Sequence, residues 1–198
     1  MRFCLTFILA LLFESIFAQD SCFQQPLFVI DNYLQDTSYP ISNRLDDYIN
    51  SFTGCNAPQF TATTLSGKKI YSKELEGKVT ILNFWFTHCK PCIDDFPSLN
   101  KLADEYSTKG VAFLSFALDD KDLLDSFLLQ HPLKYNVVPA SKDLAELFKI
   151  AAYPTTMILD KNFKVVKILH GGNTNPGENF KNYELLKPYI EEQLKKKH

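Results

Sequence analysis

The chain has 198 residues, of which 45% are hydrophobic and 22% are charged, and this composition fits one globular domain with additional segments. The formal net charge is only −2, so no strong electrostatic field favours nucleic acid or an anionic membrane as a partner. The remaining chemical signals come from five cysteines and their neighbours.

Residues 1–18 have the layout of a secretory signal peptide. Arg2 supplies the positive end, residues 3–13 are almost wholly apolar, and Ala18 offers a small residue at the cleavage point. The apolar run is short for a membrane span, although a retained N-terminal membrane anchor remains an alternative. We therefore expect cleavage near Ala18 and an extracytoplasmic protein, periplasmic or secreted.

Cleavage would remove Cys4 and leave four cysteines, an even number that favours pairing in an oxidising compartment. If Cys89 pairs with Cys92, the partners left are Cys22 and Cys55. A Cys22–Cys55 bond would tie the N-terminal segment to the domain. In the alternative, Cys55 is a small buried hydrophobe and Cys22 a free thiol, and spacing alone does not decide between the two.

Residues 19–53 are an N-terminal extension without recognisable chemistry. Residues 27–30 fit a short strand, and residues 44–52 fit a helix that Ser42 would cap and Gly54 would end. Beyond Gly54, residues 60–65 and 69–71 flank a Ser-Gly turn signal and predict a hairpin. Residues 72–75 follow as a helical turn.

The central stretch of the sequence is a buried strand that leads into a pair of cysteines. Residues 81–86 are almost wholly apolar, and Cys89-Lys90-Pro91-Cys92 then opens a helix. The first sulfur of such a pair lies near unpaired backbone N–H groups, which favour the nucleophilic thiolate. A zinc site would want a second cysteine pair or a histidine pair, and neither is present in the sequence. The pattern favours reversible disulfide chemistry, with a structural disulfide or a metal site as alternatives.

The rest of the chain alternates helices and strands. We expect a helix over residues 89–106 that is bent at Pro97, and a parallel strand over residues 111–118 that is buried on both faces. The remaining elements are a helix at 121–130, a strand at 135–138, a helix at 142–150, antiparallel strands at 157–159 and 163–169, and a helix at 182–197. This order predicts an α/β fold with a central mixed β-sheet flanked by helices.

Four short stretches together resemble a known family. They are Gly54 to Phe60, Gly77-Lys78 with Asn83-Phe84-Trp85, Cys89 to Cys92 with Phe96-Pro97, and Tyr153-Pro154-Thr155. The resemblance is to the thioredoxin-like fold, and more closely to the TlpA/ResA branch of thiol–disulfide oxidoreductases, in the superfamily that also holds the AhpC/TSA peroxiredoxins. It covers about residues 54 to 194, and we assign residues 54–198 to the thioredoxin-like domain.

The resemblance implies roles for individual residues. Cys89 would be the exposed attacking cysteine and Cys92 the resolving one, while Asp95 would accept a proton from the buried thiol. Pro154 would be the cis-proline facing the disulfide, with an ordinary trans loop proline as the alternative. The residues expected to contact substrate are Trp85, His88, Pro91, Tyr153 and Thr155.

Three positions depart from the family pattern. His88 replaces the usual aromatic residue before the first cysteine, and a cationic imidazole there would stabilise the Cys89 thiolate; the alternative is a surface histidine without a role. Asp95 replaces a glutamate and is one carbon shorter, so a solvated helix acid is its alternative. Asn83 stands where cytoplasmic thioredoxins keep a buried aspartate, which shifts proton handling toward Asp95 or water.

The expected activity is thiol–disulfide exchange with disulfide-containing extracytoplasmic proteins, apocytochromes in cytochrome c maturation being one example. An upstream thiol reductant, for instance a membrane-bound one, would complete the cycle, and we expect no cofactor, metal or nucleic acid. One alternative is a peroxiredoxin-like thiol peroxidase, although the proline of that family's motif is missing and Thr87 is displaced by one position. The other is a copper-binding or redox-inert interaction module on the same fold, which the two methionines of the chain disfavour.

Overall fold

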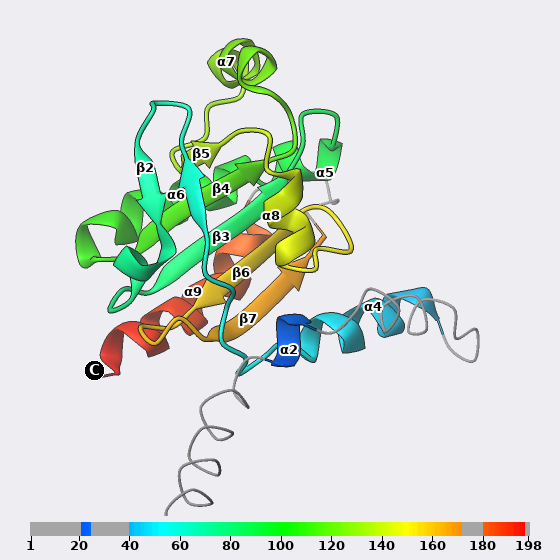
Figure 1. Ribbon diagram of the computed structural model, residues 1–198, viewed down its shortest axis with the longest axis vertical. Helices are drawn as coiled ribbons and strands as arrows, with labels where there is room; N and C mark the ends of the chain where they lie inside the picture. Colours follow the sequence, from blue (N-terminus) through cyan, green and yellow to red (C-terminus); the bar gives the residue numbers. More distant parts are fainter. Residues whose placement is uncertain (1–20, 25–39, 172–179, 197–198) are drawn as a thin grey trace, which may run out of the picture.

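The computed structural model describes residues 21–24, 40–171 and 180–196, and its centre is a five-stranded mixed sheet (Figure 1). The strands lie in the order β5-β4-β3-β6-β7. Their bounds are β3 Thr80–Trp85, β4 Ala112–Ala117, β5 Asn136–Val138, β6 Thr155–Leu159 and β7 Val165–His170. Strands β3, β4 and β5 are parallel, whereas β6 and β7 run antiparallel to their neighbours. The predicted mixed sheet and the predicted parallel strand near residues 111–118 are therefore confirmed.

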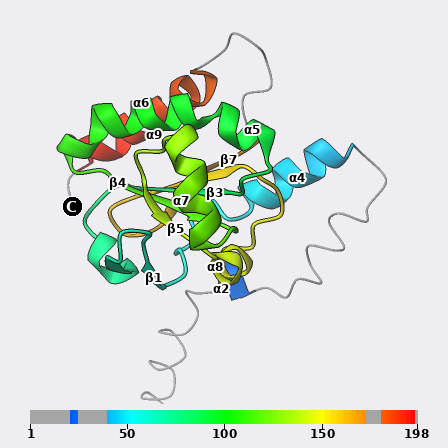
Figure 2. The same cartoon turned by 90° about the horizontal axis from the view of Figure 1, so that it is seen from above.

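Helices cover both faces of this sheet, as Figure 2 shows from above. One face carries α6 (Phe96–Tyr106) and α9 (Lys181–Lys195), and the opposite face carries α8 (Lys142–Leu147) with the hairpin of β1 (Thr61–Thr63) and β2 (Lys69–Tyr71). The other elements are η1 (Ser72–Leu75), α5 (Lys90–Asp94), η2 (Ser107–Lys109) and α7 (Lys121–Gln130). The hairpin turns at Gly67, whose φ of +83° is a conformation that glycine adopts without strain.

The central strand β3 serves two hydrophobic cores because successive side chains point to opposite faces of a sheet. Leu82 and Phe84 belong to the core under α8, which is rich in phenylalanine. Ile81 and Trp85 belong to the core under α6 and α9, which also contains both cysteines of the Cys-Lys-Pro-Cys stretch. Every residue of β3 is buried, as a strand covered on both faces requires.

The N-terminal extension is joined to the domain through α2 (Ser21–Gln24) and α4 (Ile41–Asn50). Cys22 and Cys55 form a disulfide with a Cα–Cα distance of 6.0 Å, so the structure adopts the paired alternative. Next to it, the Phe23 ring stacks on Phe52 at 4.6 Å and meets Phe148 edge-on at 6.0 Å. The described part of the extension thus contributes directly to the core under α8.

The segment after Gly54 pairs with the start of β7. Gly54 donates its N–H to the Val165 carbonyl at 2.8 Å, Val165 donates to Cys55 at 2.9 Å, and Ala57 donates to Phe163 at 2.9 Å. These bonds occupy backbone groups that an edge strand would otherwise leave exposed. The disulfide therefore anchors α2 to a segment that is itself fixed to the sheet.

Two predictions about helices are wrong. Ser42 is not the N-cap of α4, because the helix begins at Ile41 directly after Pro40. The single helix predicted over residues 89–106 is divided at Asp95 into α5 and α6. Pro97 has no N–H to donate to the Ile93 carbonyl, and it lies instead in the first turn of α6, where the missing donor costs little.

Some predictions fall on residues that the structure does not describe. They are the signal peptide at 1–18 and the strand at 27–30. The boundaries placed after residues 18 and 53 stay predictions.

Candidate active site

The Cys89–Cys92 pair lies where β3 ends and α5 begins. The two residues form a disulfide with a Cα–Cα distance of 5.3 Å, and Cys89 occupies the N-cap position of α5. Cys89 is 5% exposed and Cys92 is 1% exposed. Cys89 is therefore more accessible than Cys92, as predicted. In this disulfide form, however, Cys89 is buried, whereas we expected an exposed cysteine.

The loop before β6 lies at the same end of the sheet. The Tyr153–Pro154 peptide bond is cis, as predicted. Pairing of Phe84 with Thr155 brings this loop beside the end of β3, and the rings of Phe86 and Tyr153 meet edge-on at 5.5 Å. Tyr153 packs against both cores, including the one that contains the cysteines. Strand pairing thus brings together two stretches that are more than 60 residues apart in the sequence.

Two residues predicted to contact substrate are instead buried. The Trp85 side chain is completely buried, and its Nε1–H donates to Ser115 Oγ at 2.6 Å. Thr155 is 3% exposed, and its hydroxyl donates to the Ala152 carbonyl at 2.7 Å. Both predictions require correction because neither side chain reaches the surface. Trp85 belongs to the same hydrophobic core as the cysteine pair, and Thr155 fixes the cis-proline loop.

Three other predicted contact residues line the rim of the site. His88 is exposed, whereas Pro91 and Tyr153 are half-buried. Pro91 lies in the first turn of α5, where its missing N–H costs little. A partner that reaches the disulfide would therefore meet an imidazole, a proline ring and an aromatic ring.

Asp95 is a fully buried carboxyl group one helical turn after Cys92. It lies at the break between α5 and α6, and its backbone N–H donates to the Cys92 carbonyl at 3.2 Å. Neither side-chain oxygen has a hydrogen bond of normal geometry among the described residues. Burial raises the pKa of Asp95 to about 6, although the polar side chains of Asn182 and Ser98 oppose this rise. The alternative of a solvated helix acid is thus excluded by its burial.

Two further buried polar atoms lack partners in the described part of the chain. The Asn83 amide donates to Thr156 Oγ1 at 3.0 Å, but its carbonyl oxygen accepts no hydrogen bond. The Tyr135 hydroxyl is likewise unpaired, and burial followed by the charge of Asp95 raises the pKa of Tyr135. The core that contains the cysteines is therefore not purely apolar.

Asp119 is a residue at this site that the sequence did not single out. It follows β4, and its carboxylate accepts hydrogen bonds from the Thr87 backbone N–H at 2.6 Å and from the Thr87 hydroxyl at 3.0 Å. Thr87 Oγ1 also lies 3.1 Å from His88 Nδ1. The sequence offered one signal for this role, which is the position of Asp119 after a parallel strand. An acidic residue that follows the strand next to β3 lies near the residues that follow β3.

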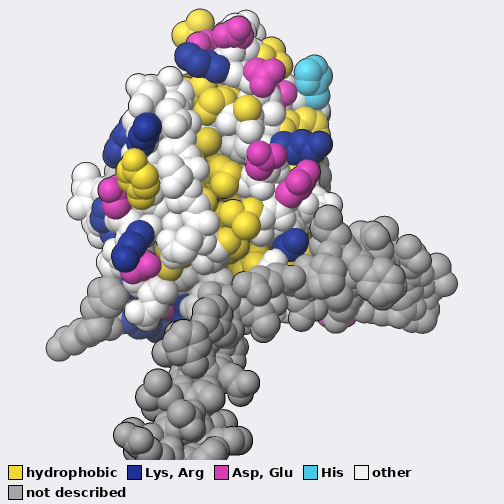
Figure 3. Space-filling view, in the orientation of Figure 1, with side chains coloured by type: hydrophobic (Ala, Val, Ile, Leu, Met, Phe, Trp, Pro, Cys, Tyr) yellow, Lys and Arg dark blue, Asp and Glu magenta, His cyan; other side chains and the backbone are white. Residues whose placement is uncertain are grey.

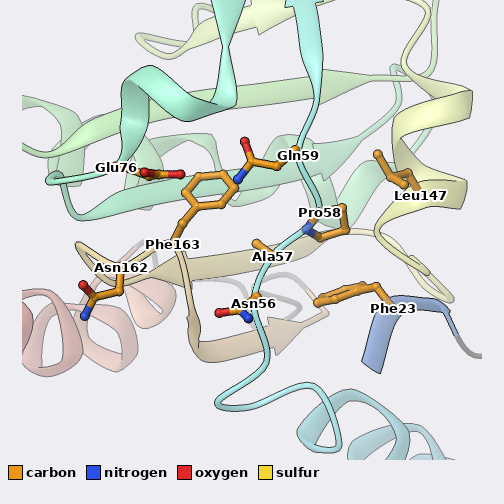
Figure 4. Close-up of a pocket in the computed structure, with 9 residues that line it drawn as sticks. All are labelled: Phe23, Asn56, Ala57, Pro58, Gln59, Glu76, Leu147, Asn162 and Phe163. Atoms are coloured by element: carbon orange, nitrogen blue, oxygen red, sulfur yellow. The ribbon is translucent and has the colours of Figure 1, made fainter. Parts of the chain in front are cut away.

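A cavity among the described residues lies elsewhere. It has a volume of about 470 Å³ and is lined by Phe23, Asn56, Ala57, Pro58, Gln59, Glu76, Leu147, Asn162 and Phe163. Figure 4 shows the Phe163 ring beside the Gln59 amide and the Glu76 carboxylate. On this face, hydrophobic side chains gather along the middle, between the β1–β2 hairpin and α8 (Figure 3). None of the lining residues belongs to the Cys89–Cys92 site, so the cavity adds nothing to its chemistry.

The described ranges contain neither a metal-binding cluster nor a membrane-spanning helix. Among residues 21–24, 40–171 and 180–196, no three side chains of His, Cys, Asp or Glu gather as a metal site. No helix in this part of the chain combines the length and the apolar character that crossing a bilayer requires.

Comparison with known proteins points to one family. A sequence profile of the AhpC/TSA family matches residues 53–168. The chain is 34% identical over 145 residues to the thiol-disulfide oxidoreductase ResA of Bacillus thuringiensis subsp. konkukian. The aligned part covers 72% of this chain and 77% of that protein. It is 33% identical over 168 residues to the protein of the same name from Halalkalibacterium halodurans, covering 82% and 92%.

A solved structure agrees with this result. A Chlorobium tepidum protein, provisionally assigned as the thiol:disulfide interchange protein DsbE, superposes with a TM-score of 0.63 at 27% identity, covering 72% of this chain and 97% of its own. The fold and the sequence therefore lead to the same group of proteins.

Proposed function

Because this chain belongs to the AhpC/TSA family and is a thiol–disulfide oxidoreductase of the ResA/DsbE type that acts on disulfide-bearing substrates, we propose that Cys89 and Cys92 are its redox pair. In this proposal Cys89 attacks the partner and Cys92 resolves the mixed disulfide. The proposal also takes the partners to be extracytoplasmic proteins.

One observation carries the proposal most directly. The Cys89–Cys92 disulfide lies at the end of β3, at the same end of the sheet as the cis-Pro154 loop, with His88, Pro91 and Tyr153 around it. This arrangement supports a site that binds an extended segment of a partner along the backbone of Tyr153, next to the reactive sulfur. Cys92 is nearly inaccessible, which favours Cys89 as the sulfur that meets the partner.

The exchange reaction needs no cofactor. In the reduced enzyme, the Cys89 thiolate attacks one sulfur of the partner's disulfide, which forms a mixed disulfide and releases one partner thiolate. Cys92, once deprotonated, attacks Cys89 Sγ, which breaks the mixed disulfide and releases the second partner thiol. The enzyme is left with the Cys89–Cys92 disulfide seen in the structure, and two electrons have passed to the partner.

Asp95 has the properties that the resolving step requires. A carboxyl group with a pKa near 6 exists in both protonation states around neutral pH, which suits a proton acceptor. Its buried position one turn after Cys92 favours proton transfer from the resolving thiol over transfer from Cys89. A bridging water would extend the reach of the short aspartate side chain.

The proposal extends to the cellular compartment of the protein and to its partners. We place the protein outside the cytoplasm, periplasmic or secreted, with apocytochrome thiols as a candidate substrate and an upstream thiol reductant to regenerate the pair. The Cys22–Cys55 disulfide supports an oxidising compartment, since such bonds persist there and are rare in the cytosol. A peroxiredoxin-like activity is the competing reading of the family, and an assay of peroxide consumption by the reduced protein separates the two.

The test uses two single variants. Cys89→Ser should abolish reduction of insulin disulfides, whereas Cys92→Ser should accumulate covalent complexes with partner proteins because the resolving sulfur is gone. A variant that replaces both Cys22 and Cys55 with serine is the matched control, since it also removes one disulfide but keeps the proposed pair. Equal reductase activity of the wild type and Cys89→Ser would rule out the assignment.

A further inference from the structure

A chain of three side chains links half-buried Asp119 to the rim of the site. The carboxylate of Asp119 accepts from the Thr87 backbone N–H at 2.6 Å and from the Thr87 hydroxyl at 3.0 Å. Thr87 Oγ1 is also 3.1 Å from Nδ1 of His88. Thr87 is 5% exposed and His88 is exposed, so the chain ends at a side chain that a partner can reach.

The direction of these hydrogen bonds is fixed by the number of protons available. An ionised carboxylate only accepts, so the single proton of the Thr87 hydroxyl is committed to Asp119. Thr87 Oγ1 can then only accept from His88, which requires a proton on Nδ1. In neutral His88 the other ring nitrogen, Nε2, consequently carries a lone pair. Nε2 has no hydrogen-bond partner in the described part of the chain.

We propose that Asp119 and Thr87 are positioning residues that hold one proton of His88 on Nδ1, so that the imidazolium form of His88 delivers its second proton, from Nε2, to the thiolate released from the partner. The inference rests on the proposed function, because it assigns the source of the proton that the released thiolate takes up. This role differs from stabilisation of the Cys89 thiolate by a nearby positive charge. Here His88 gives its proton to the sulfur of the partner.

The Cys89 thiolate forms a bond to one partner sulfur while the partner's S–S bond breaks, and the electron pair of that bond leaves on the second partner sulfur. This thiolate takes the proton from Nε2 of the His88 imidazolium and departs as a neutral thiol. His88 is left neutral with its remaining proton on Nδ1, and solvent returns the proton to Nε2. No additional oxidant or reductant is needed.

The first measurement is the tautomer of His88, read from its ring ¹⁵N chemical shifts at a pH where the imidazole is neutral. The wild type should carry the proton on Nδ1. Thr87→Val removes the acceptor and should move the proton to Nε2, the tautomer that water favours, whereas Thr87→Ser should keep it on Nδ1. A proton on Nε2 in the wild type would overturn the inference.

Asp119→Asn is the sharpest variant because it preserves shape but replaces one acceptor oxygen with a donor. If the amide oxygen keeps the Thr87 N–H, the NH₂ group faces Thr87 Oγ1 and donates to it. The Thr87 hydroxyl proton is then no longer held by residue 119 and becomes available to His88 Nδ1, so the proton on the imidazole should move from Nδ1 to Nε2. An unchanged tautomer in Asp119→Asn would contradict the proposed direction of the chain.

The second measurement compares two leaving groups in single turnovers of the reduced protein. Dithiobis(nitrobenzoate) releases a weakly basic aromatic thiolate that leaves readily without a proton, whereas hydroxyethyl disulfide releases a more basic alkyl thiolate whose departure gains more from protonation. Asp119→Asn and His88→Ala should each lower the ratio of the alkyl rate to the aromatic rate by about tenfold or more, as expected for loss of a general acid. An equal ratio in wild type and variants would refute the proton-donor role.

A double variant separates positioning from general damage to the site. In the His88→Ala background, Asp119→Asn should not lower the rate ratio any further, because both changes remove the same proton donor. A further fall would show that Asp119 acts independently of His88. Failure of the proposed function has a different signature, because the wild type would then reduce neither disulfide.

Discussion

Among the individual residues, Asp95 has the environment that most changes its chemistry. A carboxyl group that is raised to a pKa near 6 by burial binds its proton more tightly in the folded than in the unfolded chain, where the pKa is about 3.9. Folding is therefore unaffected by this group below about pH 4. The stability penalty grows as the pH rises from about 4 to 6, and it is complete above that range.

Asp95→Asn should therefore stabilise the fold at neutral pH while slowing turnover. The shift of about two units corresponds to about 2–3 kcal/mol in the free energy of unfolding. Urea denaturation of wild type and variant between acidic and neutral pH measures this difference, which should shrink toward zero near pH 4. A variant that is less stable than the wild type at neutral pH would show that the interactions of the carboxylate with Asn182 and Ser98 outweigh the cost of its burial.

Trp85 should contribute to stability and not to partner binding, because its side chain is buried. Trp85→Phe would leave the Ser115 hydroxyl without its donor and should lower the free energy of unfolding by about 1–3 kcal/mol. The KM for a protein disulfide should not rise, since the side chain is 0% exposed. Circular dichroism follows unfolding in a variant without tryptophan, and Tyr153→Ala at the rim is the comparison whose KM should rise.

At the scale of elements, α2 is the smallest unit with a definable contribution. Its helix is too short to be stable alone, and it is fixed by the Cys22–Cys55 bond and by the contacts of Phe23. The two cysteines are separated by 33 residues in the sequence. The described contacts of α2 therefore depend on a covalent link to the segment that pairs with β7.

Replacing both Cys22 and Cys55 with serine should lower stability by about 3–4 kcal/mol, because closing a loop of that length removes entropy from the unfolded chain. Thermal unfolding under non-reducing conditions measures the loss. Disulfide exchange should persist below the lowered melting temperature, since the Cys89–Cys92 pair is intact. Loss of exchange in a folded variant would assign the second disulfide a direct role in the reaction.

The elements also show where patterns in the sequence were informative. Both ends of the helix at Lys121–Gln130 were predicted correctly, and the ends of β4 and α9 were predicted to within two residues. Hydrophobic periodicity is a strong signal of secondary structure in such segments. The break at Asp95 was not predicted. A proline inside a periodic pattern fits either a bend within one helix or the start of a new helix. In the structure a new helix, α6, starts at Phe96 and packs against α9.

For the whole molecule, the main consequence is that the thioredoxin-like part does not complete its own core. The family profile begins at residue 53, yet Phe23, Tyr48, Ile49 and Phe52 are all buried in the core under α8. Each such side chain contributes about 1.5–3 kcal/mol when it is fully buried. A domain boundary at residue 53 would therefore divide a single hydrophobic core.

A truncation that begins at Gly54 should consequently lose several kcal/mol of stability, an amount comparable to the total of about 5–15 kcal/mol for a typical domain. Urea denaturation and binding of a hydrophobic dye compare the truncated protein with one that begins at Gln19. Equal stability of the two would show that the extension packs on a core which is complete without it.

The sequence by itself determined the order of elements, the mixed sheet and the cysteine pair at the end of a buried strand. These are local patterns, set largely by side-chain periodicity. The cis form of Pro154 was implied by the resemblance to a known family. Only the tertiary structure decided that Cys22 bonds to Cys55, that Trp85 and Thr155 are buried, that Asp95 is fully enclosed, and that Asp119 holds Thr87. Those facts depend on which distant segments meet, and spacing along a chain does not encode the distance between residues 30 or more positions apart.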